Sequence, residues 1–275
     1  MKLVGKFWQV FAIILAIIWI IPFAWMAGTA FTEPTLKMSI FPTTPPSLQN
    51  FVDVFTMVPL GQYFLNTIII VICTFSLQFF MITMGGYALA RGGFAGEKIV
   101  MGIIMAQIII PNDVLIVPNY LTISKLGLID TKLAIMLPFL GSAMGLFLMR
   151  QQFKSMPYAL TEAAIIDGAS TMRIIWNIYV PNAKTAYLAF GMISVSYHWN
   201  NFLWPLIVTN SVENRPLTVG LAIFSRSTET ALLWGDICAC AFAISIPLVL
   251  AFVIFQKQFI NSFVRHCRQK CRFVV

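Results

Sequence analysis

The sequence predicts an all-α integral membrane protein with six transmembrane helices. Hydrophobic residues make up 59% of the 275 residues and charged residues only 10%, whereas a soluble domain has about 25% charged residues. A membrane-spanning helix needs about 20 apolar residues at a rise of about 1.5 Å each. Six uncharged stretches are candidates, at residues 7–32, 54–90, 99–112, 133–149, 185–212 and 237–256. The third is short, so it needs a charged residue at a membrane interface to complete a span.

The first helix is expected at about residues 7–29. Lys2 and Lys6 precede it as in a signal peptide, but the hydrophobic stretch is longer than the roughly 7 to 15 residues of a signal core. We therefore expect a retained helix, kinked at Pro22. Residues 33–62 contain five prolines, which predicts an extracytoplasmic segment of turns and short helices.

Five further helices are expected, and one connection between them is much longer than the others. The helices lie at about residues 64–90, 97–111, 133–149, 186–209 and 237–256. The predicted division is residues 1–62 for the first helix and the extracytoplasmic segment, 63–258 for a five-helix transmembrane domain, and 259–275 for a cytoplasmic tail. About 35 residues connect the fourth and fifth helices, and a loop this long usually has a function.

The charged residues predict the orientation of the chain. With the amino and carboxyl termini both in the cytoplasm, the cytoplasmic segments hold 13 of the 18 basic residues and three of the ten acids, and the outer segments hold the rest. The two faces then carry +10 and −2, which sum to the net charge of +8. Basic residues gather on the cytoplasmic side of membrane proteins. Because they are spread over separate loops and the tail, we expect the lipid bilayer as the partner and no nucleic acid.

The cysteines predict neither a disulfide nor a metal site. Cys73, Cys238 and Cys240 fall in the hydrophobic stretches, and Cys267 and Cys271 fall in the tail, where cytoplasmic thiols stay reduced. His266 with the two tail cysteines would supply only three candidate ligands among basic residues, which makes a poor metal site. We expect no metal and no cofactor in this chain.

The long cytoplasmic connection, residues 155–184, predicts an angled pair of short helices. Its sequence is SMPYALTEAAIIDGASTMRIIWNIYVPNAK. Pro157 suits a first helical turn, Gly168 a left-handed helix end, and Ser170 the cap of a second helix that Pro181 would end. Ala163 and Ala164 would offer a surface that another protein can approach closely, with the charge of Glu162 beside them. An amphipathic helix lying on the membrane is the alternative that these residues leave open.

This segment resembles the cytoplasmic signature of binding-protein-dependent ABC importer permeases. That signature is EAA, three residues, G, nine residues, then I, any residue, L and P, and Val180 stands here at its Leu position. The resemblance implies coupling helices that seat in a cleft of an ATPase subunit. On this chain the ATPase-coupling residues would be Glu162, Ala163, Ala164, Asp167, Gly168, Ile178 and Pro181.

Further stretches resemble the carbohydrate branch of this family, in particular the shorter six-helix permease of maltose-type importers. They are GYALARGGFAG from Gly86, IPNDVLIVPNYLTISKLGLIDT from Ile110, FLMRQQFKSMP from Phe147 and WNNFLWPLIVT from Trp199. The tail VRHCRQKCRFVV departs from the pattern. The resemblance implies a type I ABC importer permease fold in a bacterial or archaeal plasma (inner) membrane, and import of a sugar or oligosaccharide. The implied partners are a second homologous permease, an ATPase dimer that carries the ATP and Mg, and an extracytoplasmic solute-binding protein.

Polar residues within the fifth helix are candidates for the substrate path. They are His198, Trp199, Asn200 and Asn201, and polar side chains at membrane depth are costly unless they face other helices or a water-filled cavity. Hydrogen bonding between helices is the alternative role. Gln78 and Gln107 are candidates by the same reasoning.

The sequence contains neither a P-loop nor any other catalytic constellation, so we expect a transport subunit and not an enzyme. A permease for a non-sugar solute such as glycerol phosphate stays open, as does an ion-coupled secondary carrier. Such carriers usually hold ionisable residues within their spans, and none of the six predicted spans clearly holds a carboxylate.

The predicted orientation can be tested by thiol labelling of single cysteines in a cysteine-free background. A cysteine in place of Lys37 or Arg215 should react with an impermeant reagent added outside the cell, and one in place of Lys154 should react only after the membrane is opened. The reverse pattern would show that the termini lie outside.

Overall fold

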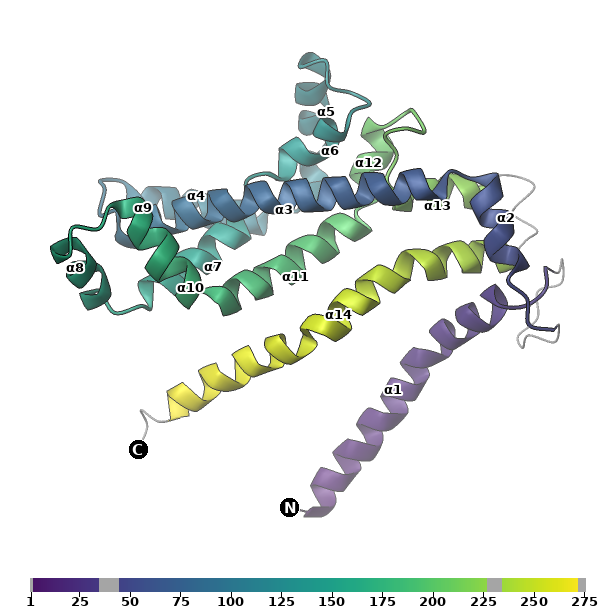
Figure 1. Cartoon of the computed structure of the whole chain (residues 1–275), viewed down its shortest axis with the longest axis horizontal. Helices are drawn as coiled ribbons and strands as arrows, with labels where there is room; N and C mark the ends of the chain where they lie inside the picture. Colours follow the sequence, from purple (N-terminus) through teal and green to yellow (C-terminus); the bar gives the residue numbers. More distant parts are fainter. Residues whose placement is uncertain (1, 35–44, 227–233, 272–275) are drawn as a thin grey trace. The chain divides into compact units, whose positions relative to one another are not determined.

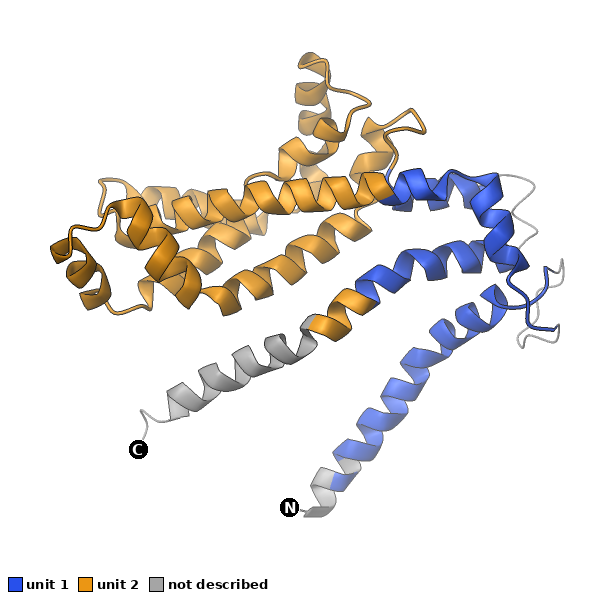
Figure 2. Ribbon diagram, in the orientation of Figure 1, with its two compact units in different colours: residues 1–64, 216–249 blue, residues 65–215, 250–275 orange. Residues whose placement is uncertain are grey.

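The computed structural model describes residues 2–34, 45–226 and 234–271, with side chains described for 6, 8–34, 45–226 and 234–254. The described part is all-helical apart from one isolated bridge between Thr32 and Pro46 (Figure 1). It divides into two compact units, one of residues 1–64 with 216–249 and the other of residues 65–215 with 250–275 (Figure 2). Lys37 and the side chains of His266, Cys267 and Cys271 lie outside the described part.

The first unit contains the amino-terminal helix and the helices that pack against its end. Helix α1 covers Lys2–Ala30 and contains Pro22, and α2 covers Gln49–Met57. The amide nitrogen of Asn50 donates hydrogen bonds to the backbone oxygens of Thr29, Ala30 and Thr32. It thereby satisfies carbonyl groups that a helix end leaves without partners. Helix α13, Leu217–Arg226, and the first part of α14, Trp234–Cys271, complete the unit.

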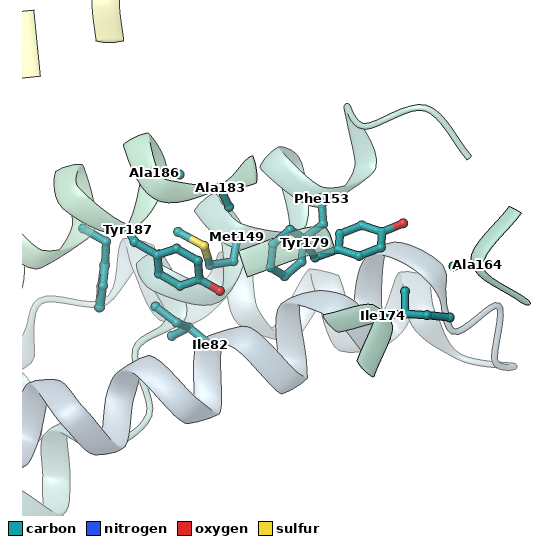
Figure 3. Close-up of a cluster of buried hydrophobic side chains, with 10 residues drawn as sticks. Ile82, Met149, Phe153, Ala164, Ile174, Tyr179, Ala183, Ala186 and Tyr187 are labelled. Atoms are coloured by element: carbon teal, nitrogen blue, oxygen red, sulfur yellow. The ribbon is translucent and has the colours of Figure 1, made fainter. Parts of the chain in front are cut away.

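The second unit is built around α3, which covers Leu60–Arg91 and begins in the first unit. The helices that follow it are α4 (Glu97–Ile109), η1 (Asn112–Leu115), α5 (Ile116–Lys125), α6 (Lys132–Met136), η2 (Leu137–Phe139), α7 (Ala143–Lys154), α8 (Ala159–Ile166), α9 (Thr171–Ile174), η3 (Ile175–Tyr179), α10 (Val180–Asn182), α11 (Lys184–Asn200) and α12 (Leu203–Val208). Side chains from α3, α7, α11 and the 155–184 segment form one buried apolar cluster (Figure 3). This cluster attaches the 155–184 segment to α3, α7 and α11.

Three predicted helices end or break before their predicted last residue. The helix predicted at 97–111 ends at Ile109, before Pro111, and the chain then turns by 97° into η1 and α5. The helix predicted at 133–149 breaks after η2 with a bend of 45°, because Pro138 lacks an N–H and Ser142 begins a new helix by accepting a hydrogen bond from the Gly145 N–H.

The third interruption divides the helix predicted at 186–209. Helix α11 ends at Asn200, and Asn201 is extended. Helix α12 starts at Leu203, with Pro205 in its first turn, where a missing N–H costs nothing. Uncharged composition alone does not reveal such breaks.

The described part contains three to five candidate membrane spans. Trp8–Ala30, Leu60–Arg91 and Trp234–Ile254 are long and apolar enough to cross a bilayer by themselves. The two bent pairs, 97–125 and 132–154, bring the number to five if each pair is one span. The fold is therefore that of an all-helical membrane protein.

Close helix packing at Gly145 generates a stability prediction. A Cβ at this position would lie 2.8 Å from Ile82 of α3 and 2.7 Å from Phe190 of α11. We expect Gly145→Ala to destabilise the protein by about 1–3 kcal/mol, the usual cost of overpacking. Gly102→Ala is the matched control, because Gly102 also lies within a helix but has no atom within 4 Å of its Cβ position. Thermal unfolding in detergent should show a lower midpoint for the first variant only, and equal midpoints would contradict the packing.

Candidate functional site

The 155–184 segment forms a helix pair with a corner at Gly168. Helix α8 is capped by Asp167, and Gly168 follows with a φ of +76°. Ser170 then caps α9, since its side chain accepts a hydrogen bond from the Arg173 N–H at 3.4 Å. The predicted positions of the corner and of the second cap are confirmed.

The second helix does not end at Pro181 as predicted. The chain widens to a π-helix in η3, continues as α10 to Asn182, and resumes as α11 at Lys184. A proline removes one hydrogen bond and its ring clashes with a carbonyl in the preceding turn of an α-helix. The wider π-turn accommodates the ring, and the Asn182 amide donates a hydrogen bond of 2.7 Å to the Ile178 carbonyl.

Five of the seven predicted coupling residues are exposed, one is half-buried and one is buried. Glu162, Ala163, Asp167, Gly168 and Pro181 are exposed, and Ile178 is half-buried. Ala164 is buried in the apolar cluster of Figure 3, so its predicted place on the exposed surface is wrong. It lies one position from Ala163 on a helix, and neighbouring residues of a helix face different directions.

Sequence reasoning missed three exposed apolar residues of α8, of which Leu160 is 46% exposed. Ile165 is 57% exposed and Ile166 is 84% exposed. Two consecutive isoleucines in a helix predicted to lie outside the membrane were a signal for an interaction surface. The exposed face of α8 therefore combines two isoleucines with the acids Glu162 and Asp167.

A polar cavity of about 370 Å³ lies in the second unit. The Gln78 side chain is central to it: its nitrogen donates 2.6 Å to the Phe139 carbonyl, and its oxygen accepts 2.6 Å from the Ser194 hydroxyl. Gln78 Nε2 also lies 3.3 Å from His198 Nε2. Among the described residues the polar or charged lining consists of Gln78, Gln107, Asn112, Ser142, Ser194, Tyr197 and His198, so the lining carries no carboxylate, lysine or arginine.

The structure brings together only part of the predicted substrate-path set. His198 lines the cavity, as do Gln78 and Gln107. Trp199 is buried elsewhere, Asn201 is half-buried outside the lining, and the exposed Asn200 donates to the Ser196 carbonyl. Residues i and i+4 share a helix face, which explains why Ser194 lines the cavity with His198 whereas the residues after His198 do not.

Asp130 fastens an extracytoplasmic turn in the predicted topology, and the sequence analysis did not single it out. Its carboxylate accepts hydrogen bonds from the N–H groups of Asn210 and Ser211, and its own φ is +62°. Burial raises the pKa of the Asp130 carboxyl, but hydrogen bonds from Ser211 and Asn210 and the charge of Arg215 oppose this, so the pKa lies below its usual value. The hydrogen bonds from Asn210 and Ser211 to the Asp130 carboxylate are therefore fully formed near neutral pH. They are lost only at acidic pH, where Asp130 becomes protonated.

A second acid lies where the sequence predicted none. Helix α14 starts at Trp234, earlier than the predicted residue 237, so its apolar span includes Asp236. Asp236 is fully buried, and neither carboxylate oxygen has a hydrogen-bond partner among the described residues. A buried ionisable group of this kind is what the ion-coupled carrier alternative required.

The comparison with protein families decides between an ABC importer permease and an ion-coupled carrier. The family model described as the binding-protein-dependent transport system inner membrane component matches residues 82–265, more than half of the chain. The chain belongs to this family. It is thus a permease subunit of a binding-protein-dependent ABC importer in the inner membrane, and not a catalytic subunit, because the ATPase is separate. The resemblance found in the coupling segment is confirmed.

Individual relatives agree with the family. The chain is 27% identical to the diacetylchitobiose uptake system permease protein NgcG of Streptomyces coelicolor, over 91% of this chain and 84% of that protein. It is 29% identical to the lactose transport system permease protein LacG of Rhizobium radiobacter, over 88% and 89%. It is also 29% identical to the sn-glycerol-3-phosphate transport system permease protein UgpE of Yersinia pestis, over 75% and 73%.

A solved structure has the same fold. It is a chain of a bacterial ABC transporter involved in the import of the acidic polysaccharide alginate, with a TM-score of 0.83 and 21% identity. The match covers 94% of this chain and 97% of that chain. The permease fold therefore extends beyond residues 82–265 to nearly the whole chain.

Proposed function

We propose that this permease forms half of the import path for a neutral sugar or oligosaccharide and is driven by an ATPase that docks on α8. The observation that carries the proposal is the exposed face of α8, which projects Ile165 and Ile166 into solvent while its other face is fixed in the apolar cluster. The family uses a separate ATPase, and a rigid, partly apolar surface outside the spans is a suitable place for it to bind.

The charges on α8 favour an ATPase over the membrane as the contact of this face. Glu162 and Asp167 are exposed beside the isoleucines. The cytoplasmic surface of a membrane is negatively charged and attracts basic segments. An acidic face is repelled by that surface, whereas a protein cleft with basic residues at its rim would bind both the isoleucines and the acids.

The proposed topology has six spans with both termini in the cytoplasm. Three spans are single helices, two are the bent pairs, and α11 with α12 forms the sixth. In this arrangement residues 63–258 form the five-helix transport domain and 259–275 a cytoplasmic tail. The basic residues of the cytoplasmic side support this orientation. A second homologous permease would supply the other half of the path, in the manner of a type I importer.

The cavity supports a neutral substrate. NgcG and LacG are named for sugars, whereas UgpE is named for glycerol phosphate and the solved transporter for an acidic polysaccharide. An anion at membrane depth needs a cationic partner. The lining described above offers amide, hydroxyl and imidazole groups, which suit sugar hydroxyls. A phosphate substrate would need a lysine or arginine from the second permease, because the described lining of this cavity contains neither.

Replacing Gln78 tests the path. Gln78→Leu leaves the Ser194 hydroxyl, His198 and the Phe139 carbonyl without their partner. One unpaired buried polar group costs about 1–3 kcal/mol. If the cost of only one of the three weakens the transport step, uptake by the reconstituted transporter falls roughly 5- to 150-fold, and we expect a decrease of at least this size. Asn200→Leu changes an exposed amide outside the cavity and should leave uptake unchanged. Copurified ATPase should be normal in both variants, and unchanged uptake in Gln78→Leu would remove the cavity from the path.

Replacing Gly168 tests the coupling surface. Valine at a φ of +76° is strained by about 1–2 kcal/mol and would turn α9 away from α8. Gly127→Val is the matched control, because Gly127 has a φ of +67° and an equally open Cβ position but lies outside the 155–184 segment. Gly168→Val should release the ATPase or separate ATP hydrolysis from uptake, and Gly127→Val should do neither. Normal copurification, hydrolysis and uptake in Gly168→Val would contradict the coupling role.

A further inference from the structure

Arg91 joins the cytoplasmic end of α3 to the cytoplasmic segment. It is the last residue of α3, and its guanidinium is partly buried. Its Nε donates a hydrogen bond of 2.9 Å to the Tyr179 hydroxyl. Its Nη2 donates to the Phe153 carbonyl at 3.0 Å and also to the Met156 carbonyl. These carbonyls lie at the end of α7 and in the link to α8, where carbonyl groups lack helical partners and a positive charge is favourable.

Tyr179 extends this connection to α8. Its side chain is 1% exposed, and its hydroxyl lies 2.6 Å from Thr161 Oγ1, which is also buried. The ring packs edge-on against Phe153 and Tyr87 at centroid distances of 5.2 Å and 5.1 Å. A continuous path of hydrogen bonds therefore runs from Arg91 through Tyr179 to Thr161 of the proposed docking helix.

Tyr158 forms a second contact between Arg91 and the α8 region. The Arg91 guanidinium lies over the Tyr158 ring at 5.3 Å and over the Tyr179 ring at 5.8 Å. Tyr158 is the residue immediately before α8. Arg91 thus contacts the start of α8 by a cation–π interaction and its interior through Tyr179.

We propose that Arg91 is a positioning residue that makes α8 and α3 move as one body when the ATPase closes. This inference rests on the proposed function, because it assumes that the ATPase docks on α8. Three hydrogen bonds from one planar guanidinium hold the end of α7, the link to α8 and η3 together at the end of a membrane-spanning helix. A lysine places its charge at a single nitrogen and cannot reproduce this fork. Displacement of α8 would reach the path through α3, which carries Gln78 of the cavity.

Arg150 provides a matched control for the loss of a partly buried arginine. Its Nη2 forms an ion pair of 2.7 Å with Glu97, and its Nε donates to the Leu89 carbonyl near the same end of α3. Neither Glu97 nor Leu89 belongs to α8 or to the 155–184 segment. If Arg91 only stabilises the end of α3, Arg150→Lys and Arg91→Lys should have the same effect. Only Arg91→Lys removes hydrogen bonds that lead to α8.

The test uses the complete transporter in proteoliposomes with its binding protein, and measures solute imported per ATP hydrolysed. Arg91→Lys and the milder variant Tyr179→Phe should keep copurified ATPase and stimulated hydrolysis, while solute imported per ATP falls by about tenfold in Arg91→Lys, as expected when a hydrogen bond to a charged group is lost. Arg150→Lys should keep the wild-type ratio. Spin labels at Ala163 and Leu77, both exposed, should show an unchanged distance on ATP binding in the wild type and a changed one in Arg91→Lys.

Two results would overturn the role of Arg91. One is a wild-type ratio of solute to ATP in both Arg91→Lys and Tyr179→Phe. The other is a ratio that falls as much in Arg150→Lys as in Arg91→Lys, which would show that Arg91 has only a structural role. If Gly168→Val uncouples the transporter while Arg91→Lys does not, only the inference about Arg91 fails. If Gly168→Val is also normal, the docking surface itself is wrong.

Discussion

Backbone groups inside a bilayer have no water to bind, and this constraint determines where the helices of this permease can break. The break after η2 frees the Phe139 carbonyl, which accepts its hydrogen bond from Gln78 of α3. The Trp204 indole similarly donates 3.1 Å to the Ala134 carbonyl of α6. Both carbonyls belong to the bent pair 132–154, and each accepts a hydrogen bond from a polar side chain of another helix. The polar residues that allow the chain to bend at Phe139 also line the cavity, so the irregular backbone and the proposed path occupy the same place.

The need for hydrogen-bond partners also shapes the carboxyl end of α7. Arg91 donates a hydrogen bond to the Phe153 carbonyl in the last turn of α7, and the same guanidinium donates one to the Tyr179 hydroxyl. A helix end that needs a donor therefore provides a stiff attachment for the segment that follows it. The apolar cluster around Tyr179 then holds one face of α8 and leaves Ile165 and Ile166 on the other. The proposed docking helix would transmit force because its inner face is fixed in this cluster.

The sequence predicted the elements that depend on local chemistry. Gly168 and Ser170 were identified from backbone preference and capping, and long uncharged stretches located α1, α3 and α14. What it could not predict depends on contacts between distant residues. Ala164 looks like an exposed small residue until α8 is packed against the cluster, and Asn200 looks like a path residue until α11 ends there. Asp130 and Arg91 are unremarkable in the sequence because their partners lie about 80 and 60 to 90 residues away.

The coupling proposal depends on one contact, that of a separate ATPase with the exposed face of α8. A photo-crosslinking amino acid in place of Ile166 tests it most directly, with Ile109 of α4 as the control, because these residues are 84% and 81% exposed. On irradiation of the assembled transporter, we expect a covalent adduct with the ATPase from position 166 and none from position 109. An adduct with lipid from position 166, or an ATPase adduct from both positions, would contradict it.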